Sequence, residues 1–299
     1  MTIHGSADPA EGGPSQDEDA GLSPAQDEAD ERFRAEGDGA EALAALARER
    51  LGADRAERWI ALWRPAIRLV PARDDEPVVA RLGGRPRVPA DFAWPAWEGH
   101  GPLSLVAEVD LDAVHACGLD AGRELPTTGR YLAFCYGEPE DLDGLVWSWD
   151  PSSRPGARLL HLPAAGPRDV ETPAPGATEY PGIPLTGRQV TTWPWDVPEA
   201  GPILGFTGDD LDDELYDEEL ELAAMGDDEG VLHQLGGWSR DVSGDVREEA
   251  ATWTDDDPAG WEPLLQIGSD DRADMLWGDL GSLYWLTKGD ESAFTWQNY

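Results

Sequence analysis

The chain has 299 residues, of which 40% are hydrophobic, and this supplies enough apolar surface for a substantial folded core. Its 61 Asp and Glu residues against 22 Lys and Arg residues give a formal net charge of −39. A field of this sign repels nucleic acid and anionic membrane surfaces, so we expect neither as a partner, whereas it attracts a basic protein.

The sequence carries no sign of a membrane or secretory segment. No stretch reaches the ~18 apolar residues of a membrane span, and the first residues lack a charged segment followed by an apolar run and a cleavage site. Two cysteines, Cys117 and Cys135, are too few for a disulfide framework. We therefore expect a soluble cytoplasmic protein with two buried thiols, and the sequence leaves its oligomeric state open.

The first 64 residues divide into two segments of different composition. Residues 1–38 hold Asp, Glu, Gly, Ser and Pro with almost no large apolar side chain, so burial cannot offset the entropy of ordering them. They are predicted to form a disordered acidic tail. Residues 39–64 are rich in Ala, Leu and Arg at helical spacing. They predict an N-terminal helical segment whose second helix begins at Asp54 and ends before Pro65.

From residue 65 onward the pattern changes to short strand-like runs bounded by Gly and Pro, which favours a largely antiparallel sheet. The predicted strands are residues 67–71, 78–82, 103–109, 130–136, 145–149, 157–162, 188–193, 263–267 and 282–287, with a shorter one near 275–277. Asp110 is the expected N-cap of a short helix between two of them. Residues 209–229, with 12 acidic and no basic side chains, predict a solvated insertion that is helical in part. The expected fold class is α+β.

Three phrases occur twice along the chain in the same order. The matched pairs are residues 82–84 with 235–237, both Leu-Gly-Gly, then 102–110 with 263–271, and 128–138 with 280–290. The common order favours an internal duplication, with repeats at about 78–138 and 231–290 that bury faces neither could bury alone. The alternative is that Gly-Gly turns and apolar strands recur in any β-rich protein.

A longer series of phrases carries a resemblance to a known family. It comprises GGRPRVPADFAWP at 83–95, GPLSLVAEVDLDAV at 101–114, LPTTGRYLAFCY at 125–136, HQLGGW at 233–238 and LLQIGSDDRADMLWGDLGSLYWL at 264–286. Over residues 65–299 the chain resembles the YwqG-like family of bacterial proteins, a domain of unknown function. The resemblance implies an α+β fold with a large, duplicated β-sheet core, and it brings no activity or cofactor with it.

Six residues are candidates for ligand binding, and they fall in two places. His233 and Gln234 lie beside the second Gly-Gly turn, where a His can act as a general base or contact a ligand, although a His bonded to a backbone carbonyl is commoner. Carboxylates near a strand end can converge on one cation, although capping of turns is their more frequent role. The densest polar pattern of this kind comprises Asp270, Asp271, Trp277 and Asp279.

The sequence lacks the usual signatures of enzymes and cofactor sites. Its five histidines do not have the spacing of a zinc site, and there is no Gly-x-Ser-x-Gly elbow, phosphate loop or dinucleotide fingerprint. We therefore expect no metal and no cofactor. Trp147 and Trp149, predicted to share one strand face, could form a platform for a sugar or a basic peptide, although such indoles more often cover a core.

Two functions remain open from the sequence. The first is a non-catalytic interaction module for a basic partner, with inhibition of a cationic toxin or nuclease as its sharpest form. It rests on the charge and on the missing catalytic signatures. The second is a small-ligand or metal-dependent enzyme that uses the cleft between the two repeats, with His233, Asp270 and Asp279 as its functional residues.

Overall fold

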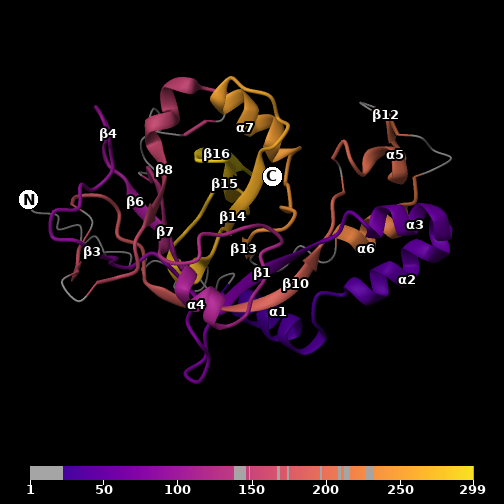
Figure 1. The fold of residues 1–299 in the computed structure, drawn as a ribbon, viewed down its shortest axis with the longest axis horizontal. Coiled ribbons are helices and arrows are strands. Elements are labelled where there is room, and N and C mark those ends of the chain that lie inside the picture. The colour runs from indigo at the N-terminus through magenta and orange to yellow at the C-terminus, as the bar shows by residue number, and fades with distance from the viewer. Residues whose placement is uncertain are drawn as a thin grey trace, which may run out of the picture.

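A computed structural model describes residues 23–137, 146–147, 149–166, 169–173, 175–195, 197–207, 210–211, 216–225 and 232–298 of the chain. Its centre is one sheet of ten strands, in which every hydrogen-bonded pair of neighbours is antiparallel (Figure 1). From one edge to the other the strands are β16 (Glu291–Gln297), β15 (Ser282–Lys288), β14 (Glu262–Gly268), β13 (His233–Leu235), β1 (Arg64–Pro71), β10 (Ile183–Thr192), β2 (Ala80–Leu82), β6 (Ser104–Asp110), β7 (Arg130–Cys135) and β8 (Ala157–Leu162). The expected α+β class with a largely antiparallel sheet is confirmed.

The sheet is organised around its central pair, β1 and β10, which pair continuously from Arg64 with Thr192 to Pro71 with Leu185. Strands β2, β6, β7 and β8 follow on one side of this pair, and β13, β14, β15 and β16 follow on the other. Each side therefore runs outward in chain order. The sheet also curves strongly, and as a result Cα atoms of its two edge strands, β8 and β16, lie within 8 Å of each other.

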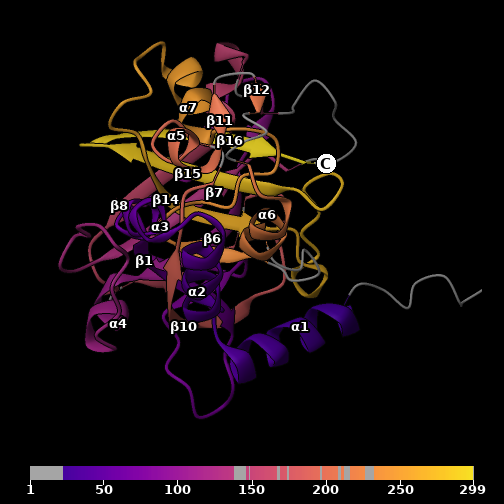
Figure 2. The same cartoon turned by 90° about the vertical axis from the view of Figure 1, so that its right-hand side faces the viewer.

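Helices and short strand pairs surround the sheet. The helices are α1 (Ser23–Glu36), α2 (Ala40–Arg50), α3 (Ala53–Ile60), α4 (Leu111–Ala116), α5 (Gly201–Leu204), α6 (Glu218–Met225) and α7 (Val246–Thr254), with the 3-10 turns η2 (Pro151–Gly156) and η3 (Asp271–Ala273). The short pairs are β3 (Arg87–Val88) with β9 (Val170–Glu171), β4 (Ala96–Trp97) with β5 (Gly101–Pro102), and β11 (Phe206–Thr207) with β12 (Asp210–Leu211). Figure 2 shows α2, α3, α5 and α6 grouped on one side of the sheet.

Two hydrophobic clusters stabilise this arrangement. The larger one fills the curved sheet, and alternate residues of the central strand β1, Ile67 and Leu69, point into it. The second joins α2, α3, α5 and α6 around Trp59, which is fully buried and donates its indole N–H to the carbonyl of Pro194 at 2.8 Å. This cluster explains why α2 and α3 form within the segment 39–64, whose last residue, Arg64, already belongs to β1.

The N-terminal tail differs from its prediction where the structure describes it. Residues 1–22 lie outside the described residues, but residues 23–36 form helix α1 rather than a disordered segment. Charges rather than apolar contacts hold this helix: Arg34 donates to Glu76 at 2.8 Å, and Asp30 accepts from Arg272 at 2.7 Å. A search for apolar periodicity does not detect such a helix.

Two predicted strands, the one near 275–277 and the one at 145–149 as far as its residues are described, are absent, and several strands of the structure were not expected. Trp147 and Trp149 lie outside any strand, because the Ser153 hydroxyl bonds both the N–H and the carbonyl of Trp147 and bends the chain before η2. Near residues 275–277 only an isolated bridge between Asp270 and Met275 forms. Strands β13 and β16, in contrast, belong to the ten-stranded sheet although the sequence did not predict them. The short strands β3, β4, β5, β9, β11 and β12 were not predicted either.

Three smaller expectations have definite outcomes. Asp110 caps α4 by accepting from the N–H of Ala113 at 2.9 Å, as predicted. Within the acidic run, residues 218–225 form α6, and residues 208–209, 212–215 and 226–229 lie outside the described residues. Cys135 is buried, whereas Cys117, which was expected to be buried, is exposed.

The second Gly-Gly turn requires its glycines. Gly236 and Gly237 have φ angles of +71° and +67°, in the left-handed region. A Cβ atom at Gly236 would lie 2.0 Å from the carbonyl oxygen of Ala121, and one at Gly237 would lie 2.5 Å from the Cβ of Ala66. The turn therefore packs its backbone directly against the central part of the sheet.

Candidate functional site

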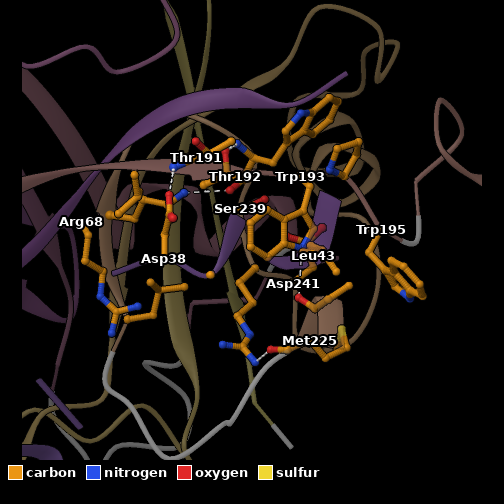
Figure 3. Close-up of a pocket in the computed structure, with 18 of the residues that line it drawn as sticks. Asp38, Leu43, Arg68, Thr191, Thr192, Trp193, Trp195, Met225, Ser239 and Asp241 are labelled. Atoms are coloured by element: carbon orange, nitrogen blue, oxygen red, sulfur yellow. Dashed lines mark hydrogen bonds between the residues drawn. The ribbon is translucent and has the colours of Figure 1, made fainter. Parts of the chain in front are cut away.

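A cavity of about 590 Å³ lies over the central strands β13, β1 and β10, and we call it the central pocket (Figure 3). Arg68 of β1, Thr191 of β10 and Gln234 of β13 line it from the sheet, while α1, α2, α6 and the segment after β13 line the other sides. This volume falls within the range of small-molecule sites, roughly 300–1,000 Å³. The pocket lies where the two sides of the sheet meet.

Part of the pocket wall is apolar and aromatic. Leu43, Trp193, Trp195 and Met225 line it (Figure 3). Trp193 is fixed in position, since its indole N–H donates to the carbonyl of Ala224 at 2.9 Å. A flat or aliphatic ligand group would gain both area burial and ring contacts against this wall.

The segment Gly236–Gly244 borders the pocket, and side chains of the sheet hold it in place; we call it the anchored loop. Gln234 donates to the carbonyls of Gly236 at 2.9 Å and Trp238 at 2.7 Å. Gln297 accepts from the N–H of Val242 at 2.8 Å and donates to the carbonyl of Gly244 at 2.9 Å.

Arg240, in the middle of the anchored loop, has its backbone fixed from two further strands. Gln266 of β14 accepts from the Arg240 N–H at 3.0 Å and donates to its carbonyl at 3.1 Å. The hydroxyl of Tyr284 on β15 donates to the same carbonyl at 2.8 Å. Side chains of four strands, β13, β14, β15 and β16, thus fix the backbone of the anchored loop. A loop held this firmly can present side chains to a ligand without a large ordering cost.

Arg68 lines the central pocket from β1. Burial lowers its pKa to about 10, against the opposing charge of Asp30. The guanidiniums of Arg240 and Arg272 lower the pKa further. The Arg68 guanidinium also lies over the ring of Phe33, at 5.2 Å from its centroid. Charges of both signs line the pocket: Arg32, Arg68, Arg240 and Arg247, and Glu36, Asp38, Glu221, Asp241 and Asp245.

Two acidic side chains of the pocket wall, Asp38 and Asp245, have roles within the protein. Asp38 accepts from the N–H of Thr191 at 2.6 Å and from that of Ala40 at 3.2 Å. Asp245 caps α7 and accepts from the Arg247 guanidinium at 2.7 Å. These carboxylates therefore stabilise the walls rather than face a ligand with unused acceptors.

Asp241, on the anchored loop, is a further acidic residue of the wall, which Glu36 and Glu221 also line. Burial raises its pKa to about 7, and the charge of Asp245 adds to that effect. One of its carboxylate oxygens, Oδ1, has no hydrogen-bond partner among the described residues. The group can therefore carry a proton near neutral pH, which removes a negative charge from the pocket.

His233 and Asp270 form a buried pair beside the pocket. His233 Nε2 lies 3.1 Å from Asp270 Oδ2, and the two side chains are 1% and 0% exposed. Burial lowers the pKa of His233 in spite of Asp270, so the imidazole is neutral and donates through Nε2. Burial alone would raise the pKa of Asp270, but the bonds from His233 and Arg272 outweigh it and hold that pKa well below its usual range.

Arg272 links this pair to α1. Its guanidinium donates to both carboxylate oxygens of Asp270, at 2.9 and 2.8 Å, and to Asp30 at 2.7 Å. The His233 Nδ1 atom has no hydrogen-bond partner among the described residues. Neither His233 nor Asp270 lines the central pocket. The cluster is thus built like an acid-base dyad but is enclosed by the fold.

The structure separates the other predicted site residues. Gln234 lines the central pocket and anchors the loop. Trp277 is buried and packs edge-on against Tyr180 at 5.8 Å. Asp271 is partly buried and Asp279 is exposed. Asp270 and Asp279 therefore differ in burial, and the described residues contain no group of three or more His, Cys, Asp or Glu side chains placed to hold a metal ion.

Sequence reasoning missed most of the pocket. Arg68, Arg240 and Asp241 are single charged residues in ordinary strand and turn contexts, and no local spacing marks them. The glutamines at 266 and 297 gave a weak signal, because a polar residue inside a hydrophobic strand needs a buried partner.

Comparison with known families covers most of the sheet. A family model described as a domain of unknown function (DUF1963) matches residues 80–294. The chain belongs to this family. The DUF1963 match begins at β2, so it leaves out β1 and the helices α1 to α3. No curated protein matches the chain. In the described part of the DUF1963 chain, no helix has the length and apolar character needed to cross a membrane.

Proposed function

We propose that this DUF1963 protein is a non-catalytic ligand-binding protein whose binding site is the central pocket. The observation that carries the proposal is the anchored loop, whose backbone four strands fix at the edge of a cavity of small-molecule size. Rigid polar groups beside an apolar wall are the usual composition of such sites.

The buried pair supports the non-catalytic part of this proposal. A general base must reach the proton that it abstracts, within hydrogen-bond distance or through one water. His233 is 1% exposed and does not line the pocket, so a ligand held there does not touch it. The pair and Arg272 instead stabilise the junction between the sheet and α1.

A blocking substitution tests the site. Ala223 on α6 lines the pocket, and its neighbour Leu222 is 66% exposed and does not. We expect Ala223→Trp to weaken binding of pocket ligands at least tenfold, because the indole fills the cavity. Leu222→Trp on the same helix is the matched control and should change affinity less than twofold. Equal effects of the two variants, measured by isothermal titration, would contradict the assignment.

A second candidate function is an interaction module for a basic partner, favoured by the net charge of −39. If the protein has this function, we expect it to capture a basic protein at low salt and to release it as the salt concentration is raised, because screening weakens exposed charge pairs. Pull-downs at two salt concentrations test it. Capture that is indifferent to salt would refute the electrostatic account. The exposed free thiol of Cys117 suits the cytoplasm, where we propose that the protein acts.

We also propose that the chain is YwqG-like within its family and that its sheet arose by internal duplication. The quoted phrases between residues 83 and 286 support the first statement. The second is supported by the strand order, because each Leu-Gly-Gly turn follows the strand next to the central pair, and three strands then run outward from it. Superposition of β2–β8 on β13–β16 in a crystal structure tests the duplication, and turns that fail to coincide would count against it.

A further inference from the structure

Helix α1 forms one wall of the central pocket, and its attachment to the protein bears on how a ligand enters; this step rests on the proposed function, since it concerns access to that site. Ala29, Arg32, Phe33 and Glu36 line the pocket from α1. Among the elements that the structure describes, the backbone of α1 runs alongside no other helix or strand, whereas α2 runs alongside α3 and α6. Side chains therefore make most of the contacts between α1 and the rest of the protein.

The contacts that hold α1 are mainly polar. Neither of the two hydrophobic clusters contains a residue of α1. Ion pairs join the helix to other segments instead, namely Arg34 with Glu76 at 2.8 Å, Asp30 with Arg272 at 2.7 Å, and Glu31 with Arg73 at 2.7 Å. Detaching α1 returns these charges to water, which offsets part of the lost attraction, whereas detaching α3 exposes the fully buried Trp59. Helix α1 can therefore detach at a lower cost in free energy than α3.

The linker that follows α1 has the properties of a hinge. Gly37 and Gly39 have φ angles of +79° and +67°, which favour glycine. A Cβ atom at either position would meet nothing within 4 Å, so neighbouring groups leave room around the linker. Asp38 between them accepts from the N–H groups of Thr191, at 2.6 Å, and Ala40, at 3.2 Å. These bonds fix the hinge to β10 and to the start of α2.

We propose that α1 is a hinged cover of the central pocket, which the ion pairs hold closed and which turns about Gly37 and Gly39 while the sheet stays folded. In the closed position the ring of Phe33 lies against the guanidinium of Arg68, which is 5.2 Å from the ring centroid. Val190 on β10, which also lines the pocket, is 8% exposed. Opening uncovers this side of the pocket to a ligand, and closure returns the Phe33 ring to the wall.

The rate at which a thiol inside the pocket reacts tests the cover without any ligand. Val190→Cys places a thiol in the wall, and Cys117→Ser removes the exposed native thiol. Cys135 lies in the larger hydrophobic cluster, where burial raises its pKa to about 12, so its labelling reports opening of the sheet in the same molecule. N-ethylmaleimide labelling of the full chain is read by mass spectrometry, with each rate divided by that of the urea-unfolded chain. We expect the thiol at position 190 to react at least tenfold faster than Cys135.

Breaking one ion pair should speed labelling at position 190 alone. Asp30→Asn removes the carboxylate that accepts from Arg272, and we expect it to raise the rate at position 190 at least fivefold and that of Cys135 less than twofold. Glu28→Gln removes the same charge from an exposed position of α1, and this matched control should leave both rates within twofold. Raising NaCl from 50 mM to 1 M should speed labelling at position 190 as Asp30→Asn does, because salt screens the ion pairs.

Two kinds of result would overturn the cover. Equal rates at position 190 and Cys135, or an equal rise of both rates in Asp30→Asn and in Arg34→Met, which breaks the pair with Glu76, would show that α1 opens only when the sheet unfolds. Rapid labelling at position 190 that neither variant nor salt changes would show that α1 does not cover the pocket. The proposed function fails by a different measurement: if Ala223→Trp does not weaken ligand binding, the pocket is not the binding site, whatever the labelling rates are.

Discussion

At the scale of single residues, Asp270 is the fully buried carboxylate of the network that it forms with His233 and Arg272. It accepts hydrogen bonds from His233 and from the side chain and backbone N–H of Arg272, and it is fully buried. A carboxylate with this many donors is ionised at all ordinary pH values and compensates the charge of an arginine inside the protein.

Removing that carboxylate should be far more damaging than removing a nearby exposed one. We expect Asp270→Ala to lower the free energy of unfolding by about 3 kcal/mol, because it leaves the Arg272 guanidinium, 13% exposed, with part of its charge uncompensated. Asp279→Ala, in the same segment but exposed, should stay within about 0.5 kcal/mol of wild type. Urea unfolding measures both, and similar losses would show that the network does not stabilise the fold.

Asp241 makes the free energy of unfolding depend on pH, because its pKa is raised in the folded protein. Its pKa is about 7 in the folded protein and near 3.8 when unfolded, so the folded state binds the extra proton between these values. Its contribution is therefore favourable at low pH and is lost as pH rises through about 7. We expect Asp241→Asn to gain stability relative to wild type at pH 8 compared with pH 5. Urea unfolding of both proteins at pH 5 and pH 8 tests this. If the stability difference between Asp241→Asn and wild type is the same at the two pH values, the prediction is refuted.

At the scale of elements, α1 differs from the other N-terminal helices in what holds it. Ion pairs dominate its contacts, among them Arg34 with Glu76 at 2.8 Å and Arg272 with Asp30 at 2.7 Å. Helix α3, in contrast, is held by the fully buried Trp59. The two helices should therefore respond differently to salt.

We expect the backbone amides of α1 to exchange with solvent several-fold faster in 1 M NaCl than in 50 mM NaCl, because the screening length falls to about 3 Å at 1 M. Apolar burial is not weakened by salt, so exchange in α3 should change little. Hydrogen exchange read by mass spectrometry reports both helices in one experiment. Equal changes in α1 and α3 would contradict the ionic account of α1.

The same contrast explains how much of the fold the sequence predicts. The apolar spacing of the sequence predicts most strands of the ten-stranded sheet and the helices at 40–60. The structure places them within a few residues of the prediction. Helix α1 has no such spacing, and its partners Glu76 and Arg272 are remote in sequence. The pocket was missed for the same reason, since Arg68 and Arg240 acquire meaning only when β1 and the anchored loop come together.

Of the six predicted site residues, the structure brings only His233 and Asp270 into contact. The apolar periodicity of the sequence places His233 and Asp270 near strand ends. It does not predict which face of the sheet other segments pack on, and therefore whether these side chains are buried. Burial of both follows from the packing of the segment after β14, where Met275 and Trp277 are buried. Whether any of the six binds a ligand stays a prediction.

At the scale of the whole molecule, the central pair joins both sides of the sheet. Strand β1 pairs with β10 on one side and with β13 on the other. Each side of the sheet therefore depends on the central pair for the backbone hydrogen bonds of its innermost strand. The curvature that brings β8 near β16 adds contacts between the far edges. We infer that the two sides depend on each other for stability.

A single cooperative unfolding transition should follow from this connection. Tryptophan fluorescence and far-UV circular dichroism should give coincident urea transitions, because loss of either half exposes the apolar face of the other. Two separate transitions would instead indicate that the halves fold as independent units.

The family match begins at β2, whereas Arg68 and two of the helices that line the central pocket, α1 and α2, come from residues 23–71. The walls of the pocket thus come in part from residues inside the family match and in part from residues before it. A substitution within residues 23–71 can therefore alter the wall of the cavity without changing any residue of the family match.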